Sequence, residues 1–259
     1  MRAYNLHFQS ANAHAVPPKD AVEIGWLGTN GPAIDASLWP RGTKTGLPMM
    51  HAFTIRLPEE YQRQGPEYPG IAFFQGEDQF ATAFEREEGD PFVQQLNASR
   101  DHPMLQRRED YTEGQFGFIW LTEAELRGGP TAPPRDVRRQ GKHCNDNEGP
   151  NAWDNPVAHG LVYRSDRNDP NAGKAPTEPE VDGYLSPDDF DGPAQPFTEW
   201  AAELSQADGH IGGTAFPAQG MPDGLTPFYL EFWDFEDLNF GGGLCQLDLE
   251  SDTFDWACS

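Results

Sequence analysis

The amino-acid sequence predicts a β-rich fold of the α+β class, and three features support this prediction. Several short runs of apolar or alternating residues have the length of strands, whereas few stretches carry the signals of a helix. The 259 residues include 27 glycines and 24 prolines, a content typical of many turns between short elements. Aromatic residues make up 12% of the chain, which is enough to fill a substantial core.

The first half of the chain contains three expected strands. Residues 49–57, MMHAFTIRL, alternate so that one face of the strand would carry Met49, His51, Phe53, Ile55 and Leu57. Residues 70–75, GIAFFQ, and 116–122, FGFIWLT, are continuous apolar runs. Runs of this kind predict strands that are buried on both faces.

Two further strands are expected near the C-terminus. Residues 226–235, TPFYLEFWDF, form the strongest candidate, and residues 243–251 form the next. Alternation along the first of them assigns three side chains to the core: Phe228, Leu230 and Phe232. Tyr229 and Trp233 point the other way, where each would be exposed or would pack in a second layer.

Two short helices are expected. Residues 122–129, TEAELRGG, begin with Thr122 as N-cap and have Glu125 three positions later, which is the pattern of a capping box. Gly128 would then end this helix. A second helix is expected over about residues 197–206, within a turn-rich region.

The chain is predicted to form one domain, residues 1–259, built from two related β-units. The first unit covers about residues 20–127 and the second about residues 197–259. In each unit a glycine turn and a proline precede a long alternating strand, and a second glycine turn precedes an apolar strand. This repetition predicts a duplication in which both units share one core. The polar stretch between them, about residues 128–196, predicts a partly ordered excursion from that core, in which only residues 158–165, AHGLVYRS, are strand-like.

Motifs near both ends of the chain carry a resemblance to a known family. They are IGWLGTNGPAIDASLWP with the following GLPM, GIAFFQGEDQF, HIGGTAFPAQ and LNFGGGLCQLDLESDTFDWACS. In this order they resemble the YwqG-like family of bacterial proteins of unknown function, although the proline of HIGGTAFPAQ is shifted. The resemblance covers about residues 24–80 and 209–259, and it implies a duplicated α+β fold without an established activity. Some members lie beside polymorphic toxin genes, an association that favours an immunity function.

The acidic residues are numerous and unevenly distributed. The formal net charge is −24, and residues 175–259 contain 18 aspartates and glutamates but no lysine or arginine. Such a surface repels nucleic acid and anionic lipid, and it attracts cationic partners over long distances. The alternative explanation is that the acidity only maintains solubility or suits a high-salt cytoplasm.

Residues that would carry catalysis or hold a metal form no recognisable pattern in the sequence. There is no Gly-x-Ser-x-Gly motif, and His143 and Cys144 lack an orienting partner nearby in the chain. We therefore assign no catalytic residue, no metal ligand and no cofactor. Calcium is the one ion with oxygen-rich candidate stretches, residues 144–156 and 165–173. Neither stretch follows the EF-hand order, and Asx-turns explain the same residues.

These observations favour a non-enzymatic acidic interaction protein, an immunity or antitoxin-like binder that neutralises a basic toxin or effector domain. Its partner would be a cationic protein, and neither nucleic acid nor a membrane is expected to bind. Attraction would come from the acidic C-terminal third, and affinity from aromatic side chains. The candidate binding residues are Asp188, Asp189, Asp191, Tyr229, Trp233, Glu236 and Asp237.

Two alternative functions stay open on the sequence alone. One is a hydrolase that uses carboxylates in a cleft between the two β-units, and the other is a small-ligand or carbohydrate-binding module.

The chain has no apolar run long enough to span a membrane, and its N-terminus lacks the apolar segment of a secretory signal. With three cysteines and no CxxC spacing, a cytoplasmic location is expected.

Overall fold

The structure is a computed structural model that describes residues 1–11, 17–84, 87–137, 149–177, 183–185 and 199–258. Within these ranges the strands are β1 (Ala3–Ser10), β2 (Val22–Leu27), β3 (Met50–Arg56), β4 (Gly70–Gln75), β5 (Leu105–Glu109), β6 (Gln115–Leu121), β7 (Gly160–Arg167), β8 (Gly209–Ile211), β9 (Tyr229–Trp233), β10 (Gly243–Asp248) and β11 (Phe254–Cys258). The helices are α1 (Pro91–Ala98), α2 (Glu123–Arg127) and α3 (Glu199–Leu204), and the 3-10 turns are η1 (Ala36–Leu38) and η2 (Glu59–Tyr61).

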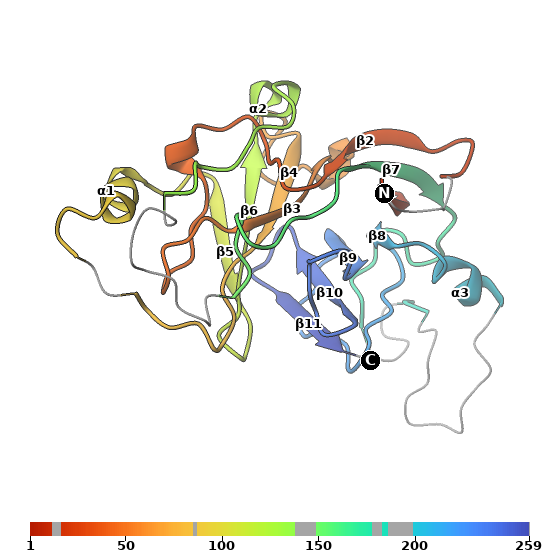
Figure 1. Cartoon of the computed structure of the whole chain (residues 1–259). Coiled ribbons are helices and arrows are strands. Elements are labelled where there is room, and N and C mark those ends of the chain that lie inside the picture. The colour runs from red at the N-terminus through yellow and green to blue at the C-terminus, as the bar shows by residue number, and fades with distance from the viewer. Residues whose placement is uncertain (12–16, 85–86, 138–148, 178–182, 186–198, 259) are drawn as a thin grey trace.

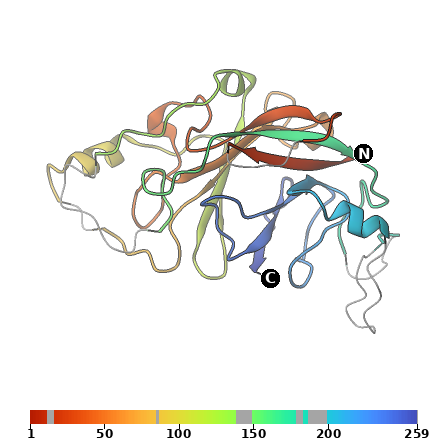
Figure 2. The same cartoon turned by 45° about the vertical axis from the view of Figure 1, so that its right-hand side comes forward.

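The strands form one 11-stranded antiparallel sheet in the order β11-β10-β9-β8-β1-β7-β2-β3-β4-β6-β5. This sheet curls until its edge strands, β5 and β11, approach each other, so the architecture is a nearly closed barrel (Figure 1). In Figures 1 and 2 helices α1 and α3 lie at opposite ends of the molecule. The β-rich character that the sequence predicts is confirmed. No helix within the described ranges has the length and apolar character needed to cross a membrane.

The apolar runs in the sequence locate a large part of this sheet. Strands β3, β4, β6, β9 and β10 overlap the five expected ranges, and β4 and β6 are buried along their whole length, as predicted. The capping box of α2 is also confirmed, because Thr122 and Glu125 each accept a hydrogen bond from the backbone N–H of the other. Helix α3 lies within the second expected helical range, whereas α1 has no counterpart in the prediction.

The centre of the sheet differs from the prediction. Strand β1, which precedes the first expected β-unit, pairs with β7 from Ala3 opposite Arg167 to Ser10 opposite Gly160. Strand β7 pairs on its other side with β2. The strand-like residues within the stretch 128–196 therefore form β7, which lies at the centre of the sheet and not outside the core. Strands such as these, which contain both polar and apolar residues, pair through backbone hydrogen bonds. Backbone pairing does not require an apolar run, so the sequence gives little sign of it.

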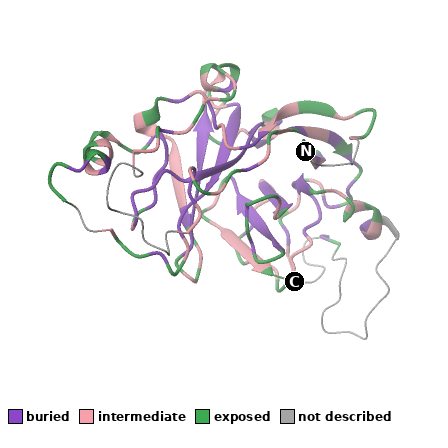
Figure 3. Cartoon of the chain, viewed as in Figure 1, coloured by how far each residue is buried: buried purple, intermediate pink, exposed green. Residues whose placement is uncertain are grey.

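The two larger apolar cores of the described chain lie on the two faces of the sheet. Strand β4 shows the division: Ile71 and Phe73 pack in the larger core inside the barrel, and Ala72 and Phe74 pack in the outer core. Inside the barrel, Phe73 stacks on Phe53 with ring centroids 5.6 Å apart. Figure 3 shows that the buried residues follow the strands, while the exposed residues lie mainly on the helices and connecting turns.

A bulge in β3 changes which of its side chains share a face. The pairing of β3 with β4 shifts register between His51 and Phe53. Phe53 packs inside the barrel, whereas Met49 packs in the outer core and His51 meets the ring of Phe74 there. The prediction that one face carries all the alternating residues of 49–57 is therefore wrong, because the extra residue of a bulge reverses the alternation.

Two consecutive glycines form the turn after β8. Gly212 has φ of 61° and Gly213 has φ of 88°, a region that favours glycine. A Cβ atom on Gly212 would lie 2.1 Å from the hydroxyl of Tyr61, and one on Gly213 would lie 2.5 Å from a carboxylate oxygen of Asp169. Both the backbone conformation and the close contacts therefore require glycine at these positions.

Candidate anion-binding pocket

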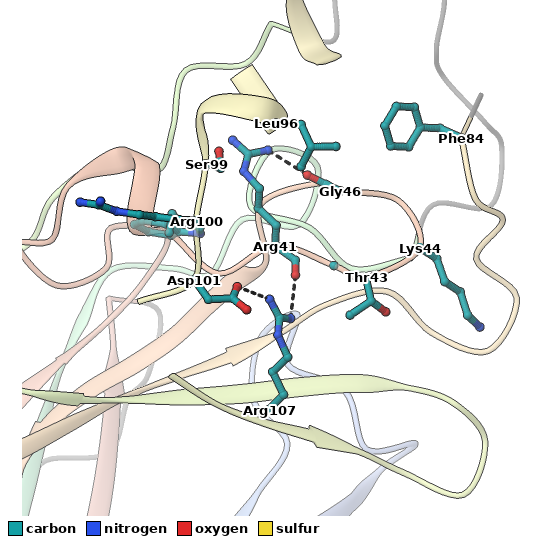
Figure 4. A pocket seen from close by; sticks show the side chains of 12 residues that line it. Arg41, Thr43, Lys44, Gly46, Phe84, Leu96, Ser99, Arg100, Asp101 and Arg107 are labelled. Carbon is teal, nitrogen blue, oxygen red and sulfur yellow. Dashed lines mark hydrogen bonds and ion pairs between the residues drawn. The ribbon is translucent and has the colours of Figure 1, made fainter. Parts of the chain in front are cut away.

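A pocket of about 290 Å³ opens beside the loop that follows η1, residues 40–48 (Figure 4). The buried Trp39 fixes the start of this loop, because its indole N–H donates a hydrogen bond to the Met49 carbonyl. Arg41 and Pro48 form an isolated β-bridge that closes the loop on itself. The loop therefore holds its residues in fixed positions along one side of the pocket.

Helix α1 and the chain before it form an apolar wall of the pocket. Asp90 caps the helix by accepting a hydrogen bond from the Phe92 backbone N–H, and Pro91 occupies the first turn. Leu96 on this helix and Phe84 before it line the pocket. In Figure 4 the guanidinium of Arg41 lies close to Leu96 and to the loop.

Arg41 is almost completely buried at this position. Only 5% of the residue is exposed. Its Nη1 donates to the Gly46 carbonyl at 2.8 Å and its Nη2 donates to Oε1 of Gln95 at 3.0 Å, but the buried Nε has no hydrogen-bond partner in the described chain. Burial lowers the pKa of Arg41 to about 10, which still leaves the side chain cationic at neutral pH.

The two other buried arginines of the described chain have partners that Arg41 lacks. Arg167 places its Nε 2.9 Å from a carboxylate oxygen of Asp169, and Arg108 places Nη2 3.5 Å from Asp252. Within the same described ranges, the Arg41 side chain donates hydrogen bonds only to a carbonyl and to an amide oxygen. A buried charge is costly unless an opposite charge compensates it. The guanidinium of Arg41 is therefore a buried cation without a counter-ion from the described protein.

Two of the other basic residues of the pocket are already paired. Arg107 forms an ion pair with Asp101 at 2.6 Å and also donates to the Arg41 carbonyl at 2.8 Å. Lys44 forms an ion pair with Glu113 at 2.7 Å. Because these carboxylates offset their charges, the two side chains mainly fix the shape of the pocket beside Arg41.

The lining of the pocket is positive although the chain as a whole is acidic. Four basic residues line it against one carboxylate, that of Asp101, in a chain of net charge −24. The exposed Arg100 forms no hydrogen bond or ion pair through its side chain within the described ranges, and it extends away from Arg41 in Figure 4. The arrangement is suited to an anion that reaches the Arg41 guanidinium.

The acidic residues predicted as a binding surface are only partly described. Glu236 and Asp237 are exposed in a turn that the isolated Phe235–Leu238 bridge closes. Trp233 is 41% exposed just before this turn, in agreement with the predicted alternation. The remaining predicted carboxylates lie outside the described residues: Asp188, Asp189 and Asp191.

Tyr229 is not available for contact with a partner. It is fully buried, packs against Ala215 and Leu225, and donates its hydroxyl to the Gly213 carbonyl at 3.1 Å. Burial also raises the pKa of this hydroxyl well above its ordinary value. Its assignment as a binding residue is wrong, because the chain after β8 covers this face of β9 as a second layer.

The oxygen-rich stretch 165–173 uses its side chains within the fold. Asp169 accepts hydrogen bonds from Arg167, from the Asn171 backbone, and from both the backbone and hydroxyl of Thr214. In the part of the chain that the structure describes, no group of three or more His, Cys, Asp or Glu side chains could hold a metal ion. Residues 144–148 of the other candidate calcium stretch lie outside that part.

No local pattern in the sequence identifies the Arg41 pocket. Its basic residues are spread between positions 41 and 107, and they meet only because the loop 40–48, the end of α1 and β5 lie together in the fold. No protein-family model matches the chain, and neither the curated proteins nor the solved structures contain a match. The chemistry of the pocket is therefore the basis for assigning a function.

Proposed function

We propose that the protein binds a small organic anion in the pocket that contains Arg41. The observation that carries the proposal is the buried guanidinium without a carboxylate partner in the described chain. Its fork of N–H donors is only partly engaged, and an anion would accept hydrogen bonds from the remaining donors. The same anion would offset the cost of burying the charge.

The walls of the pocket restrict the kind of anion. Leu96 and Phe84 supply an apolar side, and about 290 Å³ is near the lower end of the volumes that small molecules occupy. A compact acid with one anionic head and a short apolar body suits these features. The head could be a carboxylate or a phosphate, and the test below includes both.

Isothermal titration calorimetry with benzoate, phenyl phosphate and inorganic sulfate, at constant ionic strength, tests this proposal. At least one of the two aromatic anions should bind more tightly than sulfate. The variant Arg41→Gln should bind at least about tenfold more weakly, because a hydrogen bond to a charged group contributes about 1.5–3 kcal/mol.

The control is Arg127→Gln, which removes a mostly exposed arginine on α2 outside the pocket. It should bind the anions as the native protein does. Equal affinity in Arg41→Gln and the native protein, or no binding of any of the three anions, would refute the proposal.

A second proposal concerns the acidic surface. We propose that a cationic protein, such as a basic toxin or effector domain, docks on the turn that carries Glu236 and Asp237. The exposed ring of Trp233 beside these exposed carboxylates supports the proposal. The carboxylates would accelerate association, and the ring would supply an apolar anchor that slows dissociation.

Binding kinetics with the protein encoded by the adjoining gene test this second proposal. Reversing both charges, Glu236→Lys with Asp237→Lys, should slow association by about tenfold at low salt. Trp233→Ala should mainly accelerate dissociation. An unchanged association rate in the charge-reversed protein would exclude this turn as the docking surface.

We further propose that the two β-units arose by duplication, in an α+β architecture of the YwqG-like kind. The strand order supports this: β2, β3 and β4 succeed one another on one side of the β1–β7 pair, and β8, β9 and β10 do so on the other.

A cytoplasmic location is proposed as well, supported by the free thiols of Cys245 and Cys258. Titration of the denatured, unreduced protein should then find all three cysteines free.

A further inference from the structure

A second pocket, of about 310 Å³, lies where the edges of the barrel meet, and we call it the seam groove. The turn after β4, residues 76–80, and the turn between β5 and β6, residues 110–114, line it from two sides. Asn239 and Trp256 line it from the C-terminal part of the chain. The groove is thus built from segments that are far apart in the sequence.

Two aromatic rings of the seam groove are unusually exposed. Tyr111 is 83% exposed and Phe80 is 68% exposed. The ring of Tyr111 is stacked with that of Trp256, with centroids 6.3 Å apart and planes 28° apart. Rings that are so exposed contribute little apolar burial to folding, so the stability of the fold does not explain them. They offer flat apolar surfaces to a ligand.

Polar groups without partners lie beside these rings. Gln115 is only 5% exposed, yet its side-chain amide forms no hydrogen bond within the described ranges. Asn239 accepts from the Gly241 backbone through its amide oxygen, and its amide nitrogen has no partner in the same ranges. The amide atoms of Gln115 are not among the buried polar atoms that lack a partner, so they are accessible from the groove. Both amides can therefore form hydrogen bonds with a polar ligand there.

The charge of the seam groove is opposite to that of the Arg41 pocket. The ionisable carboxylates of its lining are Glu77, Asp78 and Asp110, and in the described chain no lysine or arginine lines it. A second anion would be repelled by these carboxylates. The ligand of this groove therefore belongs to a different chemical class from the anion proposed above.

We propose that the seam groove binds a neutral saccharide. A sugar ring has an apolar C–H face, which can stack on an exposed ring such as Tyr111 or Phe80. Its hydroxyls both donate and accept hydrogen bonds, so they can bond to the Gln115 amide and to the carboxylate of Asp78, of which one oxygen accepts from the Phe80 backbone. Exposed aromatic rings beside accessible polar side chains, in a described lining without basic residues, suit this ligand class.

Titration calorimetry with cellohexaose, maltohexaose and xylohexaose tests the proposal. At least one of these neutral sugars should bind, and Tyr111→Ala should weaken that binding by about tenfold. Tyr111→Phe keeps the ring and should change the affinity by less than about twofold. Because Tyr111 is so exposed, its removal should leave the thermal unfolding of the protein unchanged.

Two further variants serve as controls. Trp233→Ala removes an exposed ring outside the groove, and Arg41→Gln alters the other pocket, so both should bind the sugar as the native protein does. Loss of sugar binding in Arg41→Gln would contradict the assignment to the seam groove. Absence of binding by all three sugars at millimolar concentration, or equal binding by Tyr111→Ala, would also overturn it. Binding only of a cationic chitosan hexamer would show that the groove recognises positive charge, which contradicts a neutral ligand.

Discussion

The indole N–H of Trp256, on edge strand β11, donates a hydrogen bond to a carboxylate oxygen of Asp110 at 2.6 Å, immediately beyond edge strand β5. The other oxygen of Asp110 accepts from the backbone N–H groups of Thr112 and Gly114 at 2.7 and 2.8 Å. One carboxylate therefore holds the β5–β6 turn and also joins the two ends of the sheet. The edge strands β5 and β11 do not pair through their backbones, so this side-chain contact closes the barrel instead.

Trp256→Phe should lower the free energy of unfolding by about 1–2 kcal/mol, because it removes the donor but keeps an aromatic ring. Burial raises the pKa of Asp110, but hydrogen bonds from Trp256 and Thr112 outweigh it, so the pKa lies below its ordinary value of 3.8. The stabilisation should be present above that value and be lost as the pH falls through the lower pKa of the folded state. Urea unfolding at neutral and acidic pH measures both effects. A variant as stable as the native protein would show that the seam does not depend on this bond.

His51 makes the fold sensitive to acid. Its Nδ1 lies 2.7 Å from the Gly28 carbonyl and must donate, so in the neutral ring Nε2 accepts from the Thr54 hydroxyl at 2.8 Å. Burial lowers the pKa of His51 to about 4, against an opposing effect of the bond to Gly28. Because the folded pKa is depressed, this contribution to stability is complete above the ordinary pKa of 6.5 and declines as the pH falls toward 4.

The free energy of unfolding should therefore decrease by on the order of 3 kcal/mol over this interval because of His51 alone. Urea unfolding between about pH 7 and pH 4 measures it. His51→Gln should be less stable at neutral pH, since it loses a buried bond, but it should show a shallower decline with acid. The same slope in the native protein and the variant would contradict this role of His51.

Gly213→Ala should destabilise the protein by about 2 kcal/mol or more, because its φ of 88° is strained for alanine and the new Cβ would approach Asp169. The matched control is Gly220→Ala, where an added Cβ meets no atom within 4 Å. Chemical unfolding of the two variants provides the comparison. Equal stability of the two would mean that the turn after β8 tolerates rearrangement.

Arg167 and Arg41 should respond in opposite ways to removal of their charge. Both are 5% exposed, but only Arg167 has a carboxylate partner, Asp169, within the described chain. Arg167→Met leaves that carboxylate buried and unpaired, which should cost about 3–5 kcal/mol. Arg41→Met removes an uncompensated cation and should change the stability by less than about 1 kcal/mol without added anion. Similar losses in the two variants, measured by urea unfolding, would mean that Arg41 already has a counter-ion.

The sequence predicts the strands whose side chains are apolar, but it misses β1 and does not place the strand-like residues of β7 at the centre of the sheet. Strands β4 and β6 are recognisable because both of their faces are buried. Strands β1 and β7 carry polar residues such as Asn5 and Arg164, although they lie at the centre of the sheet. The bulge between His51 and Phe53 also could not be predicted. It reverses which residues face the inside of the barrel, but the residues of the strand show no sign of this change.

The candidate sites could not be predicted from the sequence for a related reason. Arg41 marks a site because no carboxylate of the described chain bonds to it. This property depends on which segments of the chain fold around Arg41, and the sequence alone does not show them. Tyr111 and Trp256 form their ring pair although they lie 145 positions apart in the sequence, so neither residue marks a site by itself. Trp233 is the exception, because simple alternation along β9 predicts its exposure.

The Nε–Hε signal of Arg41 in a proton–nitrogen NMR spectrum, followed during titration with benzoate, tests the central claim most directly. The signal is assigned by its absence from the spectrum of Arg41→Lys. We predict that this signal shifts in a saturable manner. The Nε of Arg41 has no partner in the described chain, and the Arg41 side chain is the group that should bind the anion. The corresponding signal of Arg167, which Asp169 already holds, should stay in place. An Arg41 signal that does not move, or that moves no more than that of Arg167, would contradict the proposal of an anion site.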